Sequence, residues 1–133
     1  MKELFVGIWS RFNATNTFKT AIGGRMYPHE APQTPTFPYA VYSLISDNPE
    51  FDFSDDHVAV QVQFSVYSEQ SSPSQSFDLF DLLKTLFDDA KPTVTGWTVL
   101  RFQRGQAQLD RDIEMKTWGY IVEYDILLER RRS

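Results

Sequence analysis

The sequence contains no cysteine, and this absence removes several kinds of chemistry. A chain without thiols forms no disulfide, no thiolate zinc site and no cysteine nucleophile, and it is compatible with a reducing cytoplasm. Histidine is scarce as well, since His29 and His57 are the only two. Each is followed or preceded by a carboxylate, Glu30 or Asp56, but neither lies in a GxSxG or HExxH context. We therefore expect surface histidines and no enzymatic activity.

Long apolar runs and an excess of positive charge are also missing. No window reaches the roughly 18 to 20 apolar residues that span a membrane. Glu3 and Arg11 interrupt the apolar N-terminal segment and no small-residue cleavage site follows, so this segment predicts a helix and not a signal peptide. Thirteen basic against eighteen acidic residues give a formal net charge of -5, which disfavours a phosphate-coating surface. At 133 residues we expect a single domain, 1–133.

Aromatic residues are abundant, with three Trp, six Tyr and eleven Phe, enough to fill a core or an interface between subunits. Near the N-terminus, apolar residues at helical spacing predict an amphipathic helix over 2–13, which Gly7 weakens slightly. A second short helical turn follows, with Asn16 among its candidate caps, and the glycines at 23 and 24 end it.

Further along the chain, strand patterns alternate with one strong helical pattern. The clearest is 58–67, where apolar residues occupy every second position. Turns are expected at 47–49 and 105–112, and a capping box at Ser72 and Gln75, with Pro73 at the first helical position, predicts a long helix over about 73–90. The strands are predicted at 39–46, 58–67, 97–103 and 116–129. The predicted fold is α+β: a four-stranded, mainly antiparallel sheet with the long helix and the N-terminal helix packed on it.

An acidic cluster follows the first predicted strand, and its members are Asp47, Glu50, Asp52, Asp55 and Asp56. Calcium loops need a glycine at the bend and a distal glutamate at a fixed offset, and this segment has neither. We therefore expect no metal site and no cofactor, but a solvated or partner-facing loop. Phe51 and Phe53 lie inside this charged segment, where contact with another chain explains them better than the core does.

Basic residues near the C-terminal strands leave one alternative open. Arg101, Arg104 and Arg111, with the basic tail 130–132, could contact phosphate, as in a small nucleic-acid-binding regulator. They could equally be charges on a strand edge that discourage wrong pairing. The net negative charge favours the second interpretation.

The segment 23–42 holds four of the seven prolines, and each proline fixes φ and removes a backbone donor, so an extended arm is expected here. Its pieces GGRMYP at 23–28, AP at 31–32 and PYAVY at 38–42 resemble the opening signature of the tail-completion and tail-terminator proteins of long-tailed bacteriophages and prophages. Such proteins continue with a second strand, one helix and two more strands, an order that fits essentially the whole chain.

The resemblance implies a structural virion protein with no catalysis. Members of the family form a ring, typically a homo-hexamer, at the head-proximal end of the tail tube. There they stop tube growth and join the tube to the head. The implied partners are other copies of the chain, the tail-tube protein and a head-completion or connector protein. DNA would pass through without specific binding, no membrane is involved, and assembly would take place in the cytoplasm of the bacterial host.

Several residues suit contacts with a neighbouring subunit or with the tube. They are Arg25, Tyr27, Pro28, Pro32, Pro35 and Pro38 in the arm, and Glu50, Phe51, Asp52, Phe53 and Asp55 in the acidic segment. Another head-tail connector component or a tail-tube-related subunit remains an alternative within structural proteins.

Overall fold

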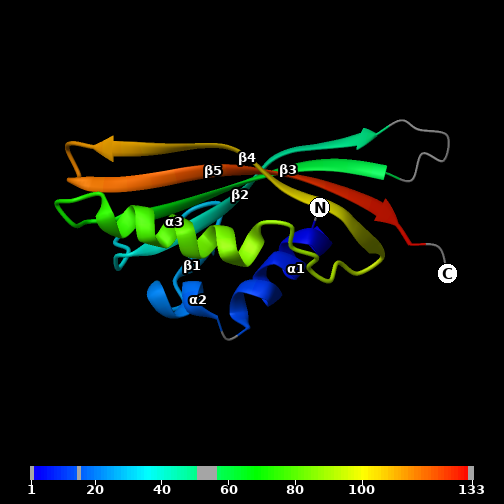
Figure 1. Ribbon diagram of the computed structural model, residues 1–133, viewed down its shortest axis with the longest axis horizontal. Helices are drawn as coiled ribbons and strands as arrows, with labels where there is room; N and C mark the ends of the chain where they lie inside the picture. Colours follow the sequence, from blue (N-terminus) through cyan, green and yellow to red (C-terminus); the bar gives the residue numbers. More distant parts are fainter. Residues whose placement is uncertain (1, 15, 51–56, 132–133) are drawn as a thin grey trace.

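The computed structural model describes residues 2–14, 16–50 and 57–131, and three helices lie on one side of a long twisted sheet (Figure 1). The helices are α1 (Lys2–Asn13), α2 (Thr17–Ala21) and α3 (Ser74–Phe87). The strands are β1 (Met26–Pro28), β2 (Tyr39–Glu50), β3 (His57–Ser68), β4 (Trp97–Asp112) and β5 (Thr117–Arg130). None of the helices in this described part of the chain is long and apolar enough to cross a membrane.

The sheet has five strands in the order β1-β2-β3-β5-β4, so the α+β class is confirmed and the prediction of four strands is wrong. The additional strand is β1, which pairs in parallel with β2, whereas the other neighbours pair antiparallel. β1 has three residues, too few to produce a readable period of two. It is a strand because β2 supplies its hydrogen-bond partners.

The core lies between the sheet and the helices and forms one cluster. In β3, Val60, Val62, Phe64 and Val66 are buried as the alternation predicts, and β5 contributes Tyr124 and its alternate neighbours. Helix α1 directs Leu4, Ile8 and Phe12 into the same cluster. The remaining fully buried large side chains are Phe18, Ile22, Leu83, Phe87, Phe102, Ile126 and Leu128.

Two predicted turns are strands in the structure. Residues 47–50 continue β2 opposite β3, and residues 104–112 continue β4 opposite β5. Irregularities between Leu44 and Ser46 and between Arg104 and Ala107 absorb the extra residues of each strand. Pairing with a long neighbouring strand therefore overrides the polar, turn-like composition of these segments.

Helix α3 spans Ser74–Phe87, within the predicted range of 73–90, but the capping box is absent. Pro73 is the N-cap residue and no side chain caps the helix. The Ser72 hydroxyl instead accepts the Ser74 backbone N–H at 3.2 Å, and the Gln75 side chain accepts the Ser68 hydroxyl proton at 2.5 Å. The Ser68 hydroxyl in β3 is thus preferred to the helix start as the partner of Gln75.

Candidate functional site

The two histidines have structural contacts. His29 is exposed, as expected, and its ring stacks on Phe5 with centroids 5.3 Å apart. His57 is half-buried, and its Nε2 lies 3.0 Å from Glu129 Oε2, so the expectation of a surface residue is wrong for it. Across the described residues, no three His, Asp or Glu side chains converge to hold a metal ion.

The acidic segment is described only in part. Asp47 is exposed in β2, and the backbone of Glu50 ends that strand opposite His57. Phe51, Asp52, Phe53 and Asp55 lie outside the described residues, so their predicted contact with another chain stays a prediction.

The arm 29–38 is closed at its base on its own subunit. Arg25 Nε donates to the Pro38 carbonyl oxygen at 3.0 Å, and Nη2 donates to the Phe37 carbonyl oxygen at 3.4 Å. The Ala40 N–H donates to the Arg25 carbonyl oxygen at 2.9 Å, which completes the β1 and β2 pairing. Gly23 and Gly24 precede this closure with φ of 61° and 75°, the left-handed region that glycine adopts without strain. The structure thus brings Arg25 and Pro38 together.

The prolines of the arm differ in exposure. Pro28 and Pro32 are exposed, whereas Pro35 and Pro38 are half-buried. Pro28 and Pro32 are therefore the two of these prolines that are most open to contact with another molecule.

A row of rings, which we call the aromatic row, lies on the sheet face opposite the helices and consists of Tyr27, Phe37, Tyr39 and Tyr67. Tyr39 is at its centre, with ring centroids 6.2 Å from Tyr27, 5.1 Å from Phe37 and 5.1 Å from Tyr67. Burial raises the pKa of Tyr39, and the neighbouring Tyr67 and Tyr27 raise it further. The predicted interface residue Tyr27 therefore belongs to a packed, half-buried aromatic surface.

The basic residues that could have contacted phosphate are largely engaged within the subunit. Arg104 Nε lies 3.2 Å from both carboxylate oxygens of Asp88. The guanidinium groups of Arg111 and Arg130 lie over the rings of Trp118 and Trp97, at 4.9 Å and 5.1 Å. These contacts favour the interpretation of the arginines as edge charges with intramolecular partners.

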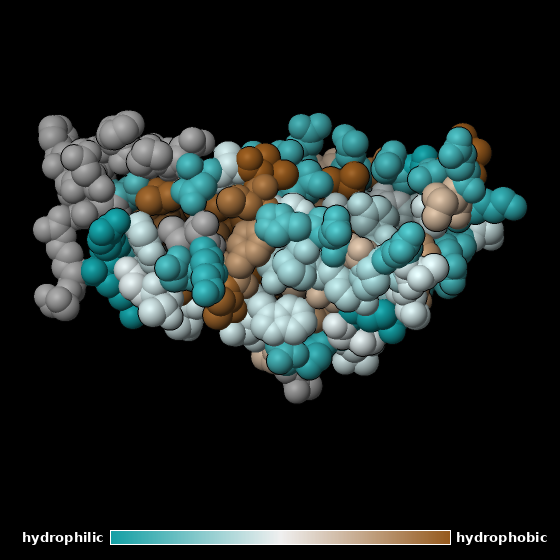
Figure 2. Space-filling view, turned by 180° about the vertical axis from the view of Figure 1, so that it is seen from behind, coloured by the Kyte–Doolittle hydropathy of each residue, from teal (hydrophilic) through white to brown (hydrophobic). Residues whose placement is uncertain are grey.

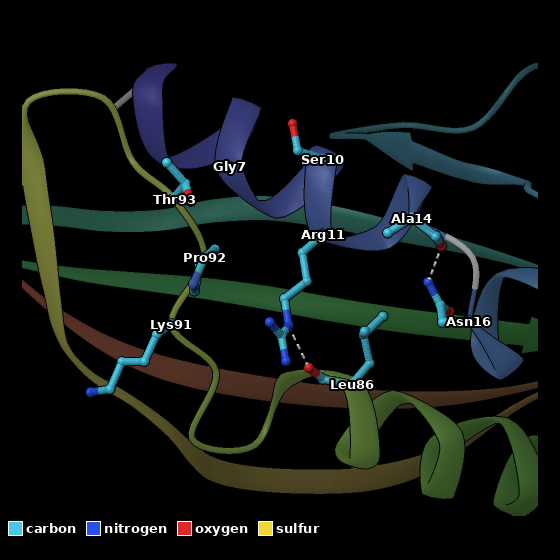
Figure 3. Close-up of a pocket in the computed structure, with 9 residues that line it drawn as sticks. All are labelled: Gly7, Ser10, Arg11, Ala14, Asn16, Leu86, Lys91, Pro92 and Thr93. Carbon is cyan, nitrogen blue, oxygen red and sulfur yellow. Dashed lines mark hydrogen bonds between the residues drawn. The ribbon is translucent and has the colours of Figure 1, made fainter.

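A pocket of about 430 Å³ opens between α1, the end of α3 and the segment 91–93 (Figure 3). Gly7 allows the chain to approach here, because a Cβ at this position would lie 2.5 Å from the Thr93 carbonyl oxygen. Arg11 points from α1 into the space beside α3, where its Nε donates to the Leu86 carbonyl oxygen at 2.7 Å. Lys91 turns its amino group away and donates to the Leu100 carbonyl oxygen at 2.8 Å. Arg11 is therefore the cation that faces the pocket.

Sequence reasoning missed the turn that joins β4 and β5. Its Ile113 and Met115 are 80% and 68% exposed, more than the other exposed large apolar residues of the described chain. The Met115 N–H donates to Asp112 Oδ1 at 3.1 Å, which orders the turn. The available signal was the alternation of these two apolar residues with charged ones, which is unusual for a polar loop.

A family model described as tail completion protein gp17 matches residues 7–129. The chain belongs to this family, and it is a structural tail protein of the bacteriophage type.

Among solved structures, a chain of the virion of a native gene transfer agent particle has the same fold, with a TM-score of 0.76. The match covers 92% of this chain and 91% of that chain at 10% sequence identity, so it establishes the fold alone. No curated protein sequence matches the chain.

Proposed function

We propose that this chain forms a ring, typically a hexamer, that caps the head-proximal end of the tail tube, stops its polymerisation and joins it to the head. The family match over residues 7–129 carries this proposal. The fold neighbour from a virion particle is consistent with it. The chain acts without catalysis or a cofactor, through self-assembly and surface recognition.

Ring formation and capping are physically linked. A head-to-tail interface repeated by rotation either closes into a ring or grows into a filament. A closed ring stops a filament when one of its faces matches the last layer of the tube and the other does not. The second face is then free to bind a head-completion or connector protein, so one small subunit can both end the tube and prepare the joint.

The contacts to neighbours involve the exposed part of the arm and the acidic segment. Pro28 and Pro32 offer an apolar, hydrogen-bond-poor surface that needs little ordering on binding. Residues 50–55 carry acidic side chains and two phenylalanines, which suits a partner with a basic and apolar surface. In contrast, Arg25, Tyr27, Pro35 and Pro38 support these contacts mainly by shaping the subunit.

Two measurements test the proposal. Light scattering should give the mass of a hexamer, either for the free protein or for protein released from tail tubes. Tubes assembled with the chain should have a defined length, whereas tubes assembled without it should grow longer. A free monomer or dimer that neither binds tubes nor limits their length would contradict the proposal.

Deletion of Phe51–Asp55 tests the acidic segment separately. We expect the subunit to fold, since the deletion leaves the paired residues of β2 and β3 in place, but to lose ring formation or tube capping. A matched deletion of 32–36 tests the arm in the same way. Normal rings and normal capping after the first deletion would remove the acidic segment from the interface and leave the ring itself in place.

A further inference from the structure

Two features of the surface are complementary in charge and in apolar character. The first is the tip of the β4–β5 hairpin. We use the name tip for residues 112–116. Ile113 and Met115 are 80% and 68% exposed, and Glu114 stands between them. Single exposed apolar residues need no explanation, but two within one short turn make a compact point of contact.

The tip is preordered by contacts of its own. Asp112 Oδ1 accepts the Met115 N–H at 3.1 Å and closes the turn. At its base, Arg111 lies over the ring of Trp118, and Trp118 Nε1 donates to the Ser71 carbonyl oxygen at 3.3 Å. Hence the hairpin is fixed to the loop before α3, and little conformational entropy is lost when the tip binds. On the right of Figure 2, at the end of the molecule where the hairpin lies, a small apolar spot stands among mostly hydrophilic residues.

The second feature is the pocket around Arg11. Its volume of about 430 Å³ lies within the range of about 300–1,000 Å³ that binding sites occupy. Leu86, Pro92 and Ala14 give it apolar lining, and the described lining residues include no acidic side chain. Beyond the bond from Nε to Leu86, Arg11 has no hydrogen-bond partner among the described residues, so its terminal nitrogens can receive a carboxylate. The pocket is thus cationic in a chain whose net charge is -5.

Other hollows of the described surface fit the tip less well. The hollow beside Arg104 includes Asp81 and Asp88, which would repel Glu114. The hollow beside Arg101 includes Asp125 and has a smaller volume, about 270 Å³. The hollow at Lys19 has no large apolar side chain in its lining, and Lys19 Nζ already donates to the Asn13 carbonyl oxygen at 3.0 Å.

The two features belong to different regions of the subunit. Figure 1 shows the turn between β4 and β5 at one end of the long axis, and the segment between α3 and β4, which walls the pocket, in the other half. Any contact between a tip and a pocket therefore joins two copies head-to-tail, the type of contact that generates rings. We infer that the tip of one copy docks into the Arg11 pocket of the next copy. Glu114 pairs with Arg11, and Ile113 and Met115 pack on Leu86 and Pro92. This inference rests on the proposed ring and adds one specific contact between its subunits.

Cross-linking tests the contact directly, because the chain has no cysteine of its own. The double variant Met115→Cys with Ala14→Cys is treated with a short bismaleimide, both as free protein and on tail tubes from a lysate that lacks the chain. A ladder of covalent oligomers that ends at the ring is expected. A mixture of the two single variants should give only one cross-linked heterodimer. The matched control pairs Met115→Cys with Thr20→Cys, an exposed position in α2 at the Lys19 hollow, and should give no ladder.

Charge exchange provides a second test. Glu114→Arg should weaken subunit association at least tenfold, and Arg11→Glu in the same chain should restore most of that loss. Lys19→Glu, a charge reversal outside the pocket, should not restore it. Two outcomes would overturn the contact but leave the proposed function standing. In the first, rings and tube capping are normal but the cross-linked ladder does not exceed that of the control. In the second, rings and tube capping are normal and Glu114→Arg has no effect on subunit association. The absence of any ring and of any capping by the unmodified chain would overturn both.

Discussion

Arg25 Nε lies 3.0 Å from the carbonyl oxygen of Pro38, so a residue just before the arm binds the residue that ends it. The loop 29–38 is thereby closed by a side chain that is itself half-buried. Arginine suits this role because its planar fork can address two carbonyl groups at once, and the second one here is that of Phe37. The prolines then stiffen a loop that is already fixed at both ends.

Replacing Arg25 by Ala should open the base of the arm. We expect the free energy of unfolding to fall by about 1–2 kcal/mol, since two hydrogen bonds from a charged donor are lost. Cleavage after Glu30 by a glutamate-specific protease should accelerate, which mass spectrometry of the fragments can follow. The exposed Arg101→Ala is the matched control and should leave both measurements nearly unchanged. An unchanged cleavage rate in Arg25→Ala would show that the strand pairing alone closes the arm.

Gly7→Ala should destabilise the chain although alanine is the better helix former. Alanine contributes about 1 kcal/mol through helix propensity. Its Cβ would lie 2.5 Å from the Thr93 carbonyl oxygen, so the 91–93 segment or α1 must move. Overpacking of this kind costs about 1–3 kcal/mol, which outweighs the gain.

Denaturant unfolding of Gly7→Ala measures whether the cost of overpacking exceeds the gain in helix propensity. Ser10→Ala on the same helix is the control. Ser10 is exposed, so its replacement should be neutral or slightly stabilising. Since the moved segment also walls the Arg11 pocket, Gly7→Ala should weaken ring formation as well. If Gly7→Ala instead raised the free energy of unfolding, the 91–93 segment would be able to move away from the added methyl group without loss of stability.

The pair Tyr124 and Asp88 predicts how stability depends on alkaline pH. Burial raises the pKa of Tyr124 above its ordinary value of 10.0, and the hydrogen bond to Asp88 Oδ1, 2.6 Å long, raises it further. A raised pKa in the folded state means that the folded chain holds this proton more tightly than the unfolded chain. The stabilisation is therefore complete below pH 10 and is lost progressively as the pH rises past it.

Urea titrations between about pH 8 and 11 can follow this loss. The free energy of unfolding of the unchanged chain should fall above pH 10, the ordinary pKa of tyrosine, and that of Tyr124→Phe should fall less steeply. At pH 8 the variant should be less stable by about 1 kcal/mol, since Asp88 keeps Arg104 but loses a donor. Equal slopes for the two chains would contradict the assignment to Tyr124.

Much of the fold could be predicted because its signals are local and periodic. The alternation in β3 and the spacing of Leu4, Ile8 and Phe12 in α1 decide which faces are buried, and the structure confirms both. Polar composition at 105–112 led to the prediction of a turn, whereas the segment is part of β4 because it pairs with β5. The composition of a segment does not show which strand will pair with it. β1 has only three residues, too few to show the alternation that predicts a strand.

The candidate contacts depended even more on tertiary structure. The Arg11 pocket exists because α1, α3 and the 91–93 segment meet, and in the sequence Gly7 looked like a mere weakness in a helix. The resemblance of the segments 23–28, 31–32 and 38–42 did identify the family, which the family match over residues 7–129 confirms. It could not tell that Arg25 acts within its own subunit.

Charge leads to a prediction about DNA. In the proposed hexamer, six copies at -5 each would give a formal charge of about -30. Arg104 is paired with Asp88, and Arg111 and Arg130 are packed over Trp118 and Trp97, so these three guanidinium groups are less available to phosphate. DNA should therefore pass the ring without adhering to it. Fluorescence anisotropy with a labelled duplex at about 0.15 M salt should detect no binding at micromolar protein. Tight binding of the duplex would favour the regulator alternative. Loss of that binding in Arg101→Glu would then locate the DNA site on β4. Weak binding that vanishes with added salt would report only nonspecific contact with phosphate.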